Sequence, residues 1–260
     1  MLFLLSPAKS LDYDTPVPLP VRAVATTPQF LAESTRLMAL LKKKTADDIA
    51  ALMDLSPALA ELNVARYKAW STRNTDLNSR PAVLAFNGDV YDGLAAKSLS
   101  LPDLAWAQKH VAILSGLHGI LRPLDRLQPY RLEMGTALPN PRGNTLYAFW
   151  GDTVAETLSA RVVGHKARVV VNLASQEYFR VADRPALTAR VIECVFEDWK
   201  NGEYKVISFF AKRARGAMAR YAITGRITLP EQLTGFAEDG YAHDAAASAP
   251  DRLVFRRRVD

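Results

Sequence analysis

The sequence predicts a mixed α/β fold in which one central mixed sheet is surrounded by helices. Three observations lead to this prediction. The chain has 260 residues, 49% of them hydrophobic, which is enough to bury one substantial core. Short runs rich in Leu, Ile and Val recur along the chain and are typical of buried strands. Longer segments between them repeat their apolar residues at helical spacing. We therefore expect residues 1–260 to form one compact domain.

Four apolar runs each end at a small polar residue. They are Leu2–Leu5 before Ser6, Val83–Phe86 before Asn87, Val111–Leu114 before Ser115, and Val169–Val171 before Asn172. Ligands of α/β sheets collect beyond strand ends, where polar loop residues converge. One such loop taken alone is more often a plain turn, since Gly, Ser and Asn are ordinary turn residues. The four together favour a shared site.

Three further strands are expected in the C-terminal part of the chain, at residues 190–196, 204–209 and 253–255. A turn at Asn201-Gly202 would join the first two, because glycine and asparagine tolerate the backbone angles of a tight hairpin.

Helices are expected at residues 28–41, from Asp152 onward, at 211–223 and, as a pair, within 45–70. Thr27 would cap the first of them, because threonine accepts a backbone N–H group and the proline that follows needs no acceptor for its own nitrogen.

The helical pair within 45–70 has a very short connection. Thr45 is a typical cap with acidic residues behind it, and Ser56-Pro57 starts the second helix. Such a pair resembles a helix-hairpin-helix, in which the second helix offers backbone N–H groups to a phosphate. However, Asp54-Leu55-Ser56 replaces the usual glycine hairpin, and a plain αα-hairpin explains the pattern equally well.

A glycine pair, Gly116 and Gly119, follows the expected strand at 111–114 directly. Prolines behind it interrupt any long helix. We interpret this segment as a loop whose backbone N–H groups bind an anion, with Arg122 close behind.

The chain is basic, with a formal net charge of +6 and a pI near 9.4. Such a charge suits an anionic partner such as nucleic acid. The basic residues are also clustered, at Lys42–Lys44, within 212–220 and at Arg256–Arg258. A charged run is usually a solvated surface, and we expect this of the last cluster.

Some function classes are disfavoured. Cys194 is the single cysteine and lies in an apolar run, so we interpret it as a core residue without disulfide or redox chemistry. The four histidines are scattered and lack the spacing of metal ligands. No apolar stretch is long enough for a membrane span, and no targeting segment is recognisable. We expect a cytoplasmic protein with no metal and no other cofactor.

If the strand ends converge, they gather donors for phosphate, acceptors for bases and carboxylates for acid–base chemistry. The residues expected to line this cleft are Ser6, Asn87, Gly88, Tyr91, Ser115, Gly116, Asn172, Ser175 and Tyr178. The candidates for a catalytic role are Lys9, Asp89, Asp125 and Glu177, with Arg122 and Lys212 beside them. No catalytic motif is identifiable, and the similarity of Ser6-x-x-Lys9 to acyl enzymes lacks their companion motifs. Whether the chain is an enzyme stays open.

Several blocks of the sequence resemble those of the bacterial YaaA family of peroxide stress proteins. The blocks are LSPAKSLD, FNGDVYDGL, LSGLHGILRPLDRLQPYRLEMG, LYAFWGD, VNLASQEYF, ISFFAKRARGAMARY and PEQLTGF. The resemblance runs nearly from end to end. It implies a cytosolic protein that helps cells survive hydrogen peroxide by limiting free iron, and that binds double-stranded DNA. It also implies the cantaloupe fold, with a positively charged cleft and a helix-hairpin-helix element, here 45–70.

Together, the charge pattern and the resemblance predict weakly sequence-dependent contacts to DNA phosphates. The residues expected to make them are Lys9, Lys42, Lys43, Lys44, Ser56, Arg122, Arg131, Lys212, Arg213 and Arg215. One alternative is an enzyme that acts on a nucleotide or nucleic-acid substrate in the same cleft. Another is a regulatory protein that acts through protein contacts. The oligomeric state stays open, and a monomer is compatible with the sequence.

Overall fold

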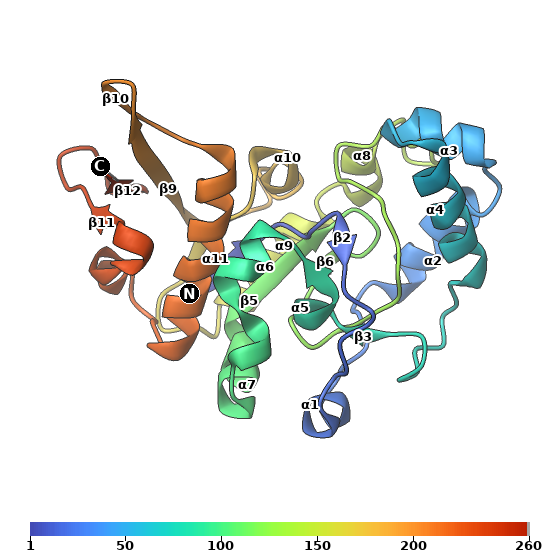
Figure 1. Cartoon of the computed structure of the whole chain (residues 1–260), viewed down its shortest axis with the longest axis horizontal. Coiled ribbons are helices and arrows are strands. Elements are labelled where there is room, and N and C mark those ends of the chain that lie inside the picture. Colours follow the sequence, from blue (N-terminus) through green and yellow to red (C-terminus); the bar gives the residue numbers. More distant parts are fainter. Residues whose placement is uncertain (259–260) are drawn as a thin grey trace.

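The computed structural model describes residues 1–258 and is built around a mixed sheet in the order β11-β12-β9-β8-β1-β5-β6, with β10 paired to β9 (Figure 1). Its strands are β1 (Leu2–Leu5), β5 (Val111–Ser115), β6 (Gly119–Leu121), β8 (Val169–Asn172), β9 (Arg190–Lys200), β10 (Glu203–Lys205), β11 (Ala242–His243) and β12 (Arg252–Arg257). Two short pairs lie outside it, β2 (Ser10–Leu11) with β4 (Phe86–Asn87) and β3 (Arg80–Pro81) with β7 (Arg126–Leu127).

The helices surround this sheet, as the sequence predicts. They are α1 (Leu19–Ala23), α2 (Leu31–Leu41), α3 (Ala46–Met53), α4 (Pro57–Ala69), α5 (Ala82–Ala85), α6 (Asp89–Leu94), α7 (Leu101–His110), α8 (Leu146–Trp150), α9 (Thr153–Val162), α10 (Gln176–Phe179) and α11 (Ser208–Thr224). Three short 3₁₀ turns are η1 (Ala96–Ser98), η2 (Pro230–Gly235) and η3 (Glu238–Gly240). The mixed α/β class is confirmed.

Strand β1 is the centre of the sheet. It runs parallel to β5 on one side and to β8 on the other, and Leu4 is paired with both Ala112 and Asn172. All four residues of β1 are fully buried, which explains the uninterrupted apolar run. Because the three strands are parallel, their carboxyl ends meet at one edge of the sheet. Helix α7 precedes β5 and contacts β1 and β5, whereas α9 precedes β8 and contacts β1 and β8.

Helices α2, α3 and α4 form a group at the end of the molecule far from β9 and β12 (Figure 1). The predicted cap of α3 is confirmed, since Thr45 accepts a hydrogen bond from the N–H group of Asp48 and donates its own N–H group to the Asp48 carboxylate. The prediction that Thr27 caps α2 is wrong: that helix begins one turn later, after Phe30, and has no side-chain cap.

Two predicted strands are partly helical. Most of the run 83–86 belongs to α5, and only Phe86 continues into β4. A buried apolar run of this length fits a helical turn as well as a strand, so its pattern cannot distinguish them. The strand expected at 204–209 ends at Lys205, and Ser208 already begins α11. The turn at Asn201-Gly202 is confirmed by the positive φ angles of both residues.

Two glycines bring α6 and α11 into close contact. A Cβ atom on Gly216 would lie 1.8 Å from the carbonyl oxygen of Val90, and one on Gly93 would lie 2.0 Å from that of Arg213. Since no side chain fits at either position, the two helices pack backbone against backbone. This contact fixes Asp89, at the start of α6, next to Lys212 on α11.

Candidate functional site

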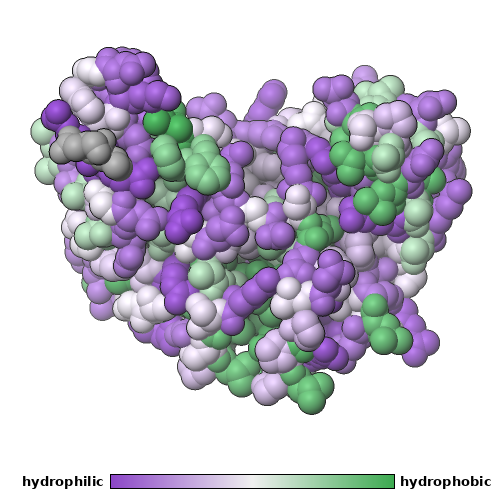
Figure 2. Space-filling view, in the orientation of Figure 1, coloured by the Kyte–Doolittle hydropathy of each residue, from purple (hydrophilic) through white to green (hydrophobic). Residues whose placement is uncertain are grey.

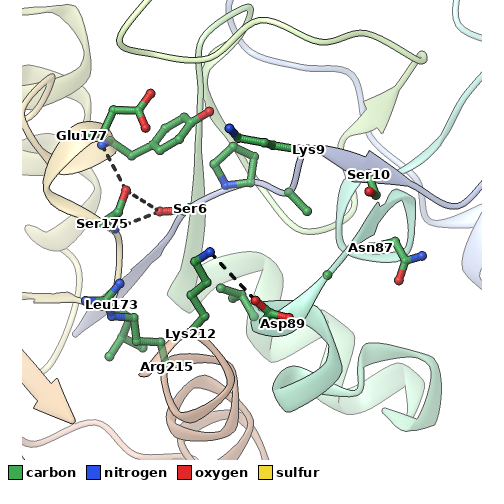
Figure 3. A pocket seen from close by; sticks show the side chains of 15 residues that line it. Ser6, Lys9, Ser10, Asn87, Asp89, Leu173, Ser175, Glu177, Lys212 and Arg215 are labelled. Carbon is green, nitrogen blue, oxygen red and sulfur yellow. Dashed lines mark hydrogen bonds and ion pairs between the residues drawn. The ribbon is translucent and has the colours of Figure 1, made fainter. Parts of the chain in front are cut away.

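A cavity of about 440 Å³ opens at the edge of the sheet where β1 and β8 end. Its wall is formed by four segments: the loop after β1, the segment before and into α6, the loop from β8 into α10, and the first turns of α11. The lining residues are Ser6, Pro7, Ala8, Lys9, Ser10, Asn87, Gly88, Asp89, Val90, Leu173, Ser175, Glu177, Tyr178, Lys212 and Arg215 (Figure 3). The small β2–β4 pair joins two of these segments, because it pairs Ser10 with Asn87.

Hydrogen bonds between Ser6 and Ser175 tie the ends of β1 and β8 together. The N–H group of Ser175 donates to Oγ of Ser6 at 2.9 Å, and the Ser6 hydroxyl donates to Oγ of Ser175 at 3.4 Å. Oγ of Ser175 also accepts from the N–H group of Tyr178 at 3.5 Å. The hydroxyl of Tyr91 donates to the carbonyl oxygen of Ser6 at 3.1 Å. The floor of the cavity is therefore held by bonds that leave the hydroxyl hydrogen of Ser175 free to donate.

Two lysines lie at the mouth of the cavity, each beside a carboxylate. Lys9 is 66% exposed and its Nζ lies 2.9 Å from Oε2 of Glu133. Lys212 is 51% exposed and its Nζ lies 3.9 Å from Oδ2 of Asp89, a distance longer than a hydrogen bond. Glu177 lies across the cavity from Lys212, and its Oε1 accepts the N–H group of Gly135 (Figure 3). The site thus combines exposed cations with carboxylates.

Arg215 lies at the floor, and its Nε is completely buried without a hydrogen-bond partner. Burial lowers the pKa of this guanidinium, while the charge of Glu193 on β9 raises it. No ion pair within residues 1–258 accompanies that attraction. The guanidinium remains charged at neutral pH, since arginine does not deprotonate in proteins.

The two tyrosines of the site are not acid–base groups. Burial raises the pKa of Tyr91 and of Tyr178 far above the usual value for tyrosine. Both phenols therefore stay protonated and act only as hydrogen-bond donors or acceptors and as packing surfaces.

Most of the residues expected at the strand ends are brought together here. The cavity contains Ser6, Lys9, Asn87, Gly88, Asp89, Ser175, Glu177, Tyr178, Lys212 and Arg215. Tyr91 does not line the cavity but bonds to the carbonyl oxygen of Ser6, which does. Asn172 is buried, and its Oδ1 accepts the N–H group of Ala174, which shapes the loop after β8.

Ser115 and Gly116 do not line the cavity. They lie in the tight β5–β6 hairpin, where Ser115 bonds to the hydroxyl of Tyr130 and accepts the N–H group of His118. The carbonyl oxygen of Gly116 accepts from Trp150, and a Cβ atom at Gly116 would lie 2.3 Å from the carbonyl oxygen of Leu132. The interpretation of 116–119 as an anion-binding loop is therefore wrong, because the whole segment is buried and packed.

Arg122 and Asp125 lie away from the cavity, towards the other edge of the sheet. Strand β6 runs antiparallel to β5, so the chain returns from the carboxyl edge before it reaches Arg122. Asp125 is fully buried and accepts from the N–H group and the guanidinium of Arg122 and from the hydroxyl of Thr26. The expectation that this pair joins the strand-end site is wrong, since the hairpin reverses the direction of the chain.

The remaining basic candidates are dispersed. Lys42 donates to the carbonyl oxygen of Trp70, and Lys43 and Lys44 follow it at the end of α2, outside the cavity. Ser56 is exposed at the start of α4 and makes no capping hydrogen bond. Arg213 pairs with Asp239 on the outer side of α11.

Sequence reasoning missed Glu133, which accepts from Arg131 through Oε1 and pairs with Lys9 through Oε2. The alternation Arg131-x-Glu133, which places both side chains on one side of an extended chain, was the available signal. It also means that Arg131 is neutralised in its own segment.

Other chemistry finds little support. Within residues 1–258 no group of three or more His, Cys, Asp or Glu side chains could hold a metal ion. Nor is any helix in that range long and apolar enough to cross a membrane. Burial raises the pKa of the Cys194 thiol to about 12, so this cysteine stays protonated and unreactive.

Comparisons with known proteins agree with the sequence resemblance. A family model described as "Peroxide stress protein YaaA" matches residues 1–247. A UPF0246 protein of Bordetella petrii is 63% identical over 259 residues, which cover 100% of both chains. UPF0246 proteins of Paracidovorax citrulli and Bordetella pertussis are 63% and 62% identical over 99% of this chain and of their own lengths. The chain therefore belongs to the YaaA family of peroxide stress proteins.

Proposed function

We propose that this peroxide stress protein acts in the cytoplasm by binding duplex DNA through exposed cations, with little dependence on base sequence. The observation that supports the proposal is the cationic mouth of the cavity, where Lys9 and Lys212 are 66% and 51% exposed. Arg213 is 51% exposed on the same helix. Figure 2 shows hydrophilic side chains around the depression between the part that carries β9 and the part that carries α3 and α4.

The helical pair α3–α4 is the second region that we propose for DNA contact. Asp54 turns the chain in the left-handed conformation, and α4 starts at Pro57 without a side chain on its first N–H groups. Those N–H groups suit a phosphate oxygen, and Lys43 and Lys44 lie before α3 in the chain. This is the way a helix-hairpin-helix holds a DNA backbone.

The test is the salt dependence of DNA affinity. Replacing both Lys9 and Lys212 by Ala should weaken binding to unrelated duplexes equally and flatten the plot of log affinity against log salt by about two units, one for each lost contact. Fluorescence anisotropy with two duplexes of different sequence measures this. Lys109→Ala, an exposed lysine on α7, is the control. An unchanged slope in the double variant would contradict the proposal.

A lower level of free iron is part of the same proposal, since hydroxyl radicals form only where ferrous iron meets peroxide. Whole-cell electron paramagnetic resonance of chelated iron, in cells with the wild-type chain or the double variant, tests whether the effect needs DNA binding. If the double variant lowers free iron as well as the wild type does, the two effects are separate.

An enzyme acting on a nucleotide or nucleic-acid substrate is the second candidate. The carboxylates of Asp89 and Glu177 favour it, because negative charge hinders pure phosphate binding and is useful for acid–base work. Asp89→Asn and Glu177→Gln should then abolish peroxide protection without weakening DNA binding. Normal protection by both variants would exclude this candidate.

A further inference from the structure

Arg215 is the starting point of a separate inference about the floor of the cavity. Three arginines of α11 can be compared. Arg213 donates from Nε to Asp239 at 3.1 Å, and Arg220 donates to the carbonyl oxygens of Leu94 and Ala95. Arg215 is more buried than Arg213, yet its Nε has no acceptor.

A buried Nε–H group without an acceptor is costly. A buried donor without a partner loses its hydration and gains nothing in return, and the loss is larger for a charged group. Arg215 cannot avoid it by losing its proton. Glu193 attracts the guanidinium only through space, as no ion pair between them exists. Arg215 is half-buried and lines the cavity, so an anion that enters from there can pair with its guanidinium.

Two further donors face the same space. Lys212 is not held by a hydrogen bond to Asp89, because the atoms are 3.9 Å apart. Ser175 accepts from Ser6 and from the backbone of Tyr178, which leaves its own hydroxyl hydrogen to donate. A planar guanidinium, an ammonium and a hydroxyl that line one cavity match a phosphoryl group, which carries three terminal oxygens.

Carboxylates lie beside these donors, since Asp89 is 3.9 Å from Lys212 and Glu177 follows Ser175 at the start of α10. Oε1 of Glu177 is held by the N–H group of Gly135, and the carboxylate of Asp89 faces the cavity near the exposed amide of Asn87. Carboxylates beside a phosphate subsite disfavour a polyphosphate, but they suit the hydroxyl groups of a sugar. The volume of about 440 Å³ lies in the range of small-molecule sites and is far too small for a duplex.

We propose that the cavity binds a free phosphate monoester of mononucleotide size. Arg215, Lys212 and Ser175 hold its phosphate, and Asp89 and Glu177 accept hydrogen bonds from its hydroxyl groups. This site shares Lys212 with the DNA contact proposed at the mouth, and a nucleic-acid backbone phosphate is the other source of the same chemistry.

Isothermal titration calorimetry of the full chain tests the site with adenosine 5′-monophosphate, adenosine and inorganic phosphate. We expect the monophosphate to bind at least tenfold more tightly than adenosine, and inorganic phosphate to compete with it. Arg215→Met should lower the affinity for the monophosphate at least tenfold, and Arg215→Lys should lower it less. The matched control Arg213→Met should leave this affinity unchanged. Thermal melting of each variant verifies folding, and the lysine variant keeps the test valid if the methionine variant unfolds.

The outcomes separate this inference from the DNA proposal. Equal binding of adenosine and its monophosphate, or equal effects at Arg215 and Arg213, would overturn the site. Duplex DNA that needs Arg215, together with no binding of the monophosphate, would also overturn it and assign Arg215 to the backbone contact. A monophosphate that binds in the absence of any DNA affinity would support the site and refute the DNA proposal.

Discussion

Arg122 follows β6, and Arg215 lies on α11 at the cavity where β1 and β8 end. The two guanidinium groups differ in their hydrogen-bond partners. Arg122 is 38% exposed, and its guanidinium donates to Asp125 from both Nε and Nη2, at 3.1 and 2.9 Å. Arg215 is also half-buried, but its Nε is completely buried and donates to nothing among the described residues. Both arginines carry the same charge, and both look alike in a list of basic residues. The difference teaches that hydrogen-bond satisfaction, rather than charge, separates a structural cation from one that is available to a ligand.

The largest effect that tests this comparison is expected at Asp125. Asp125→Ala removes a buried carboxylate that accepts from Arg122 and Thr26, and should lower the free energy of unfolding by about 3 kcal/mol. The monophosphate affinity should stay unchanged. Chemical denaturation measures the first effect, and calorimetry measures the second.

Asp251→Ala is the matched control, because Asp251 forms an exposed ion pair with Arg190. Such a pair contributes less than about 1 kcal/mol. If both aspartate variants lose equal stability, Asp125 is not the structural partner that the comparison requires.

His118 sharpens the comparison with a second buried nitrogen that lacks a partner. Its Nδ1 bonds to Ser34, but its Nε2 has no partner among residues 1–258. Burial lowers the pKa of His118 from 6.5 to about 3. The ring therefore stays neutral at neutral pH and avoids the free-energy cost of a buried charge. The unfolded chain binds the proton more readily, so the stabilising contribution is complete above pH 6.5 and is lost as the pH falls towards 3.

Denaturation at pH 7, 6, 5 and 4 measures this effect. His118 should contribute a slope of up to about 1.4 kcal/mol per pH unit below pH 6. His118→Gln should lose that part of the slope, whereas Arg215→Lys should keep it. A slope that is identical in the wild type and the glutamine variant would refute the assignment.

The smallest effects are expected at the two caps of the helical pair. Thr45→Ala removes the side-chain bond of the capping box, keeps the bond from the backbone N–H group to Asp48, and should cost about 1 kcal/mol of stability. Ser56→Ala should change stability by less than about 0.5 kcal/mol, because its hydroxyl caps nothing. A thermal melt compares them. If Ser56→Ala weakens the binding of duplex DNA without loss of stability, the Ser56 hydroxyl belongs to the proposed contact. A loss of stability as large as that of Thr45→Ala would show that the hydroxyl caps α4 after all.

The sequence predicts the cavity where parallel strands end, because β1 and β8 are buried on both faces and appear as apolar runs before Ser6 and Asn172. It does not predict the exclusion of Arg122, since an apolar run does not show that β6 turns back along β5. The helix at 82–85 is missed for a similar reason, because four buried apolar residues fit either structure. The sequence also does not show that Nε of Arg215 lacks an acceptor. That depends on how α11 and the loop after β8 are placed around the cavity, which no residue spacing reveals.

The place of β1 in the sheet has a consequence for biosynthesis. Ser6 and Ser175, which join the ends of β1 and β8, are 169 residues apart along the chain. The apolar strand β1 is therefore synthesised long before either neighbouring strand has left the ribosome. Until then it is exposed to mispairing, and closing so long a loop is entropically slow. The nascent N-terminal segment should thus be a substrate for ribosome-associated chaperones, and productive folding must wait until translation has passed β8.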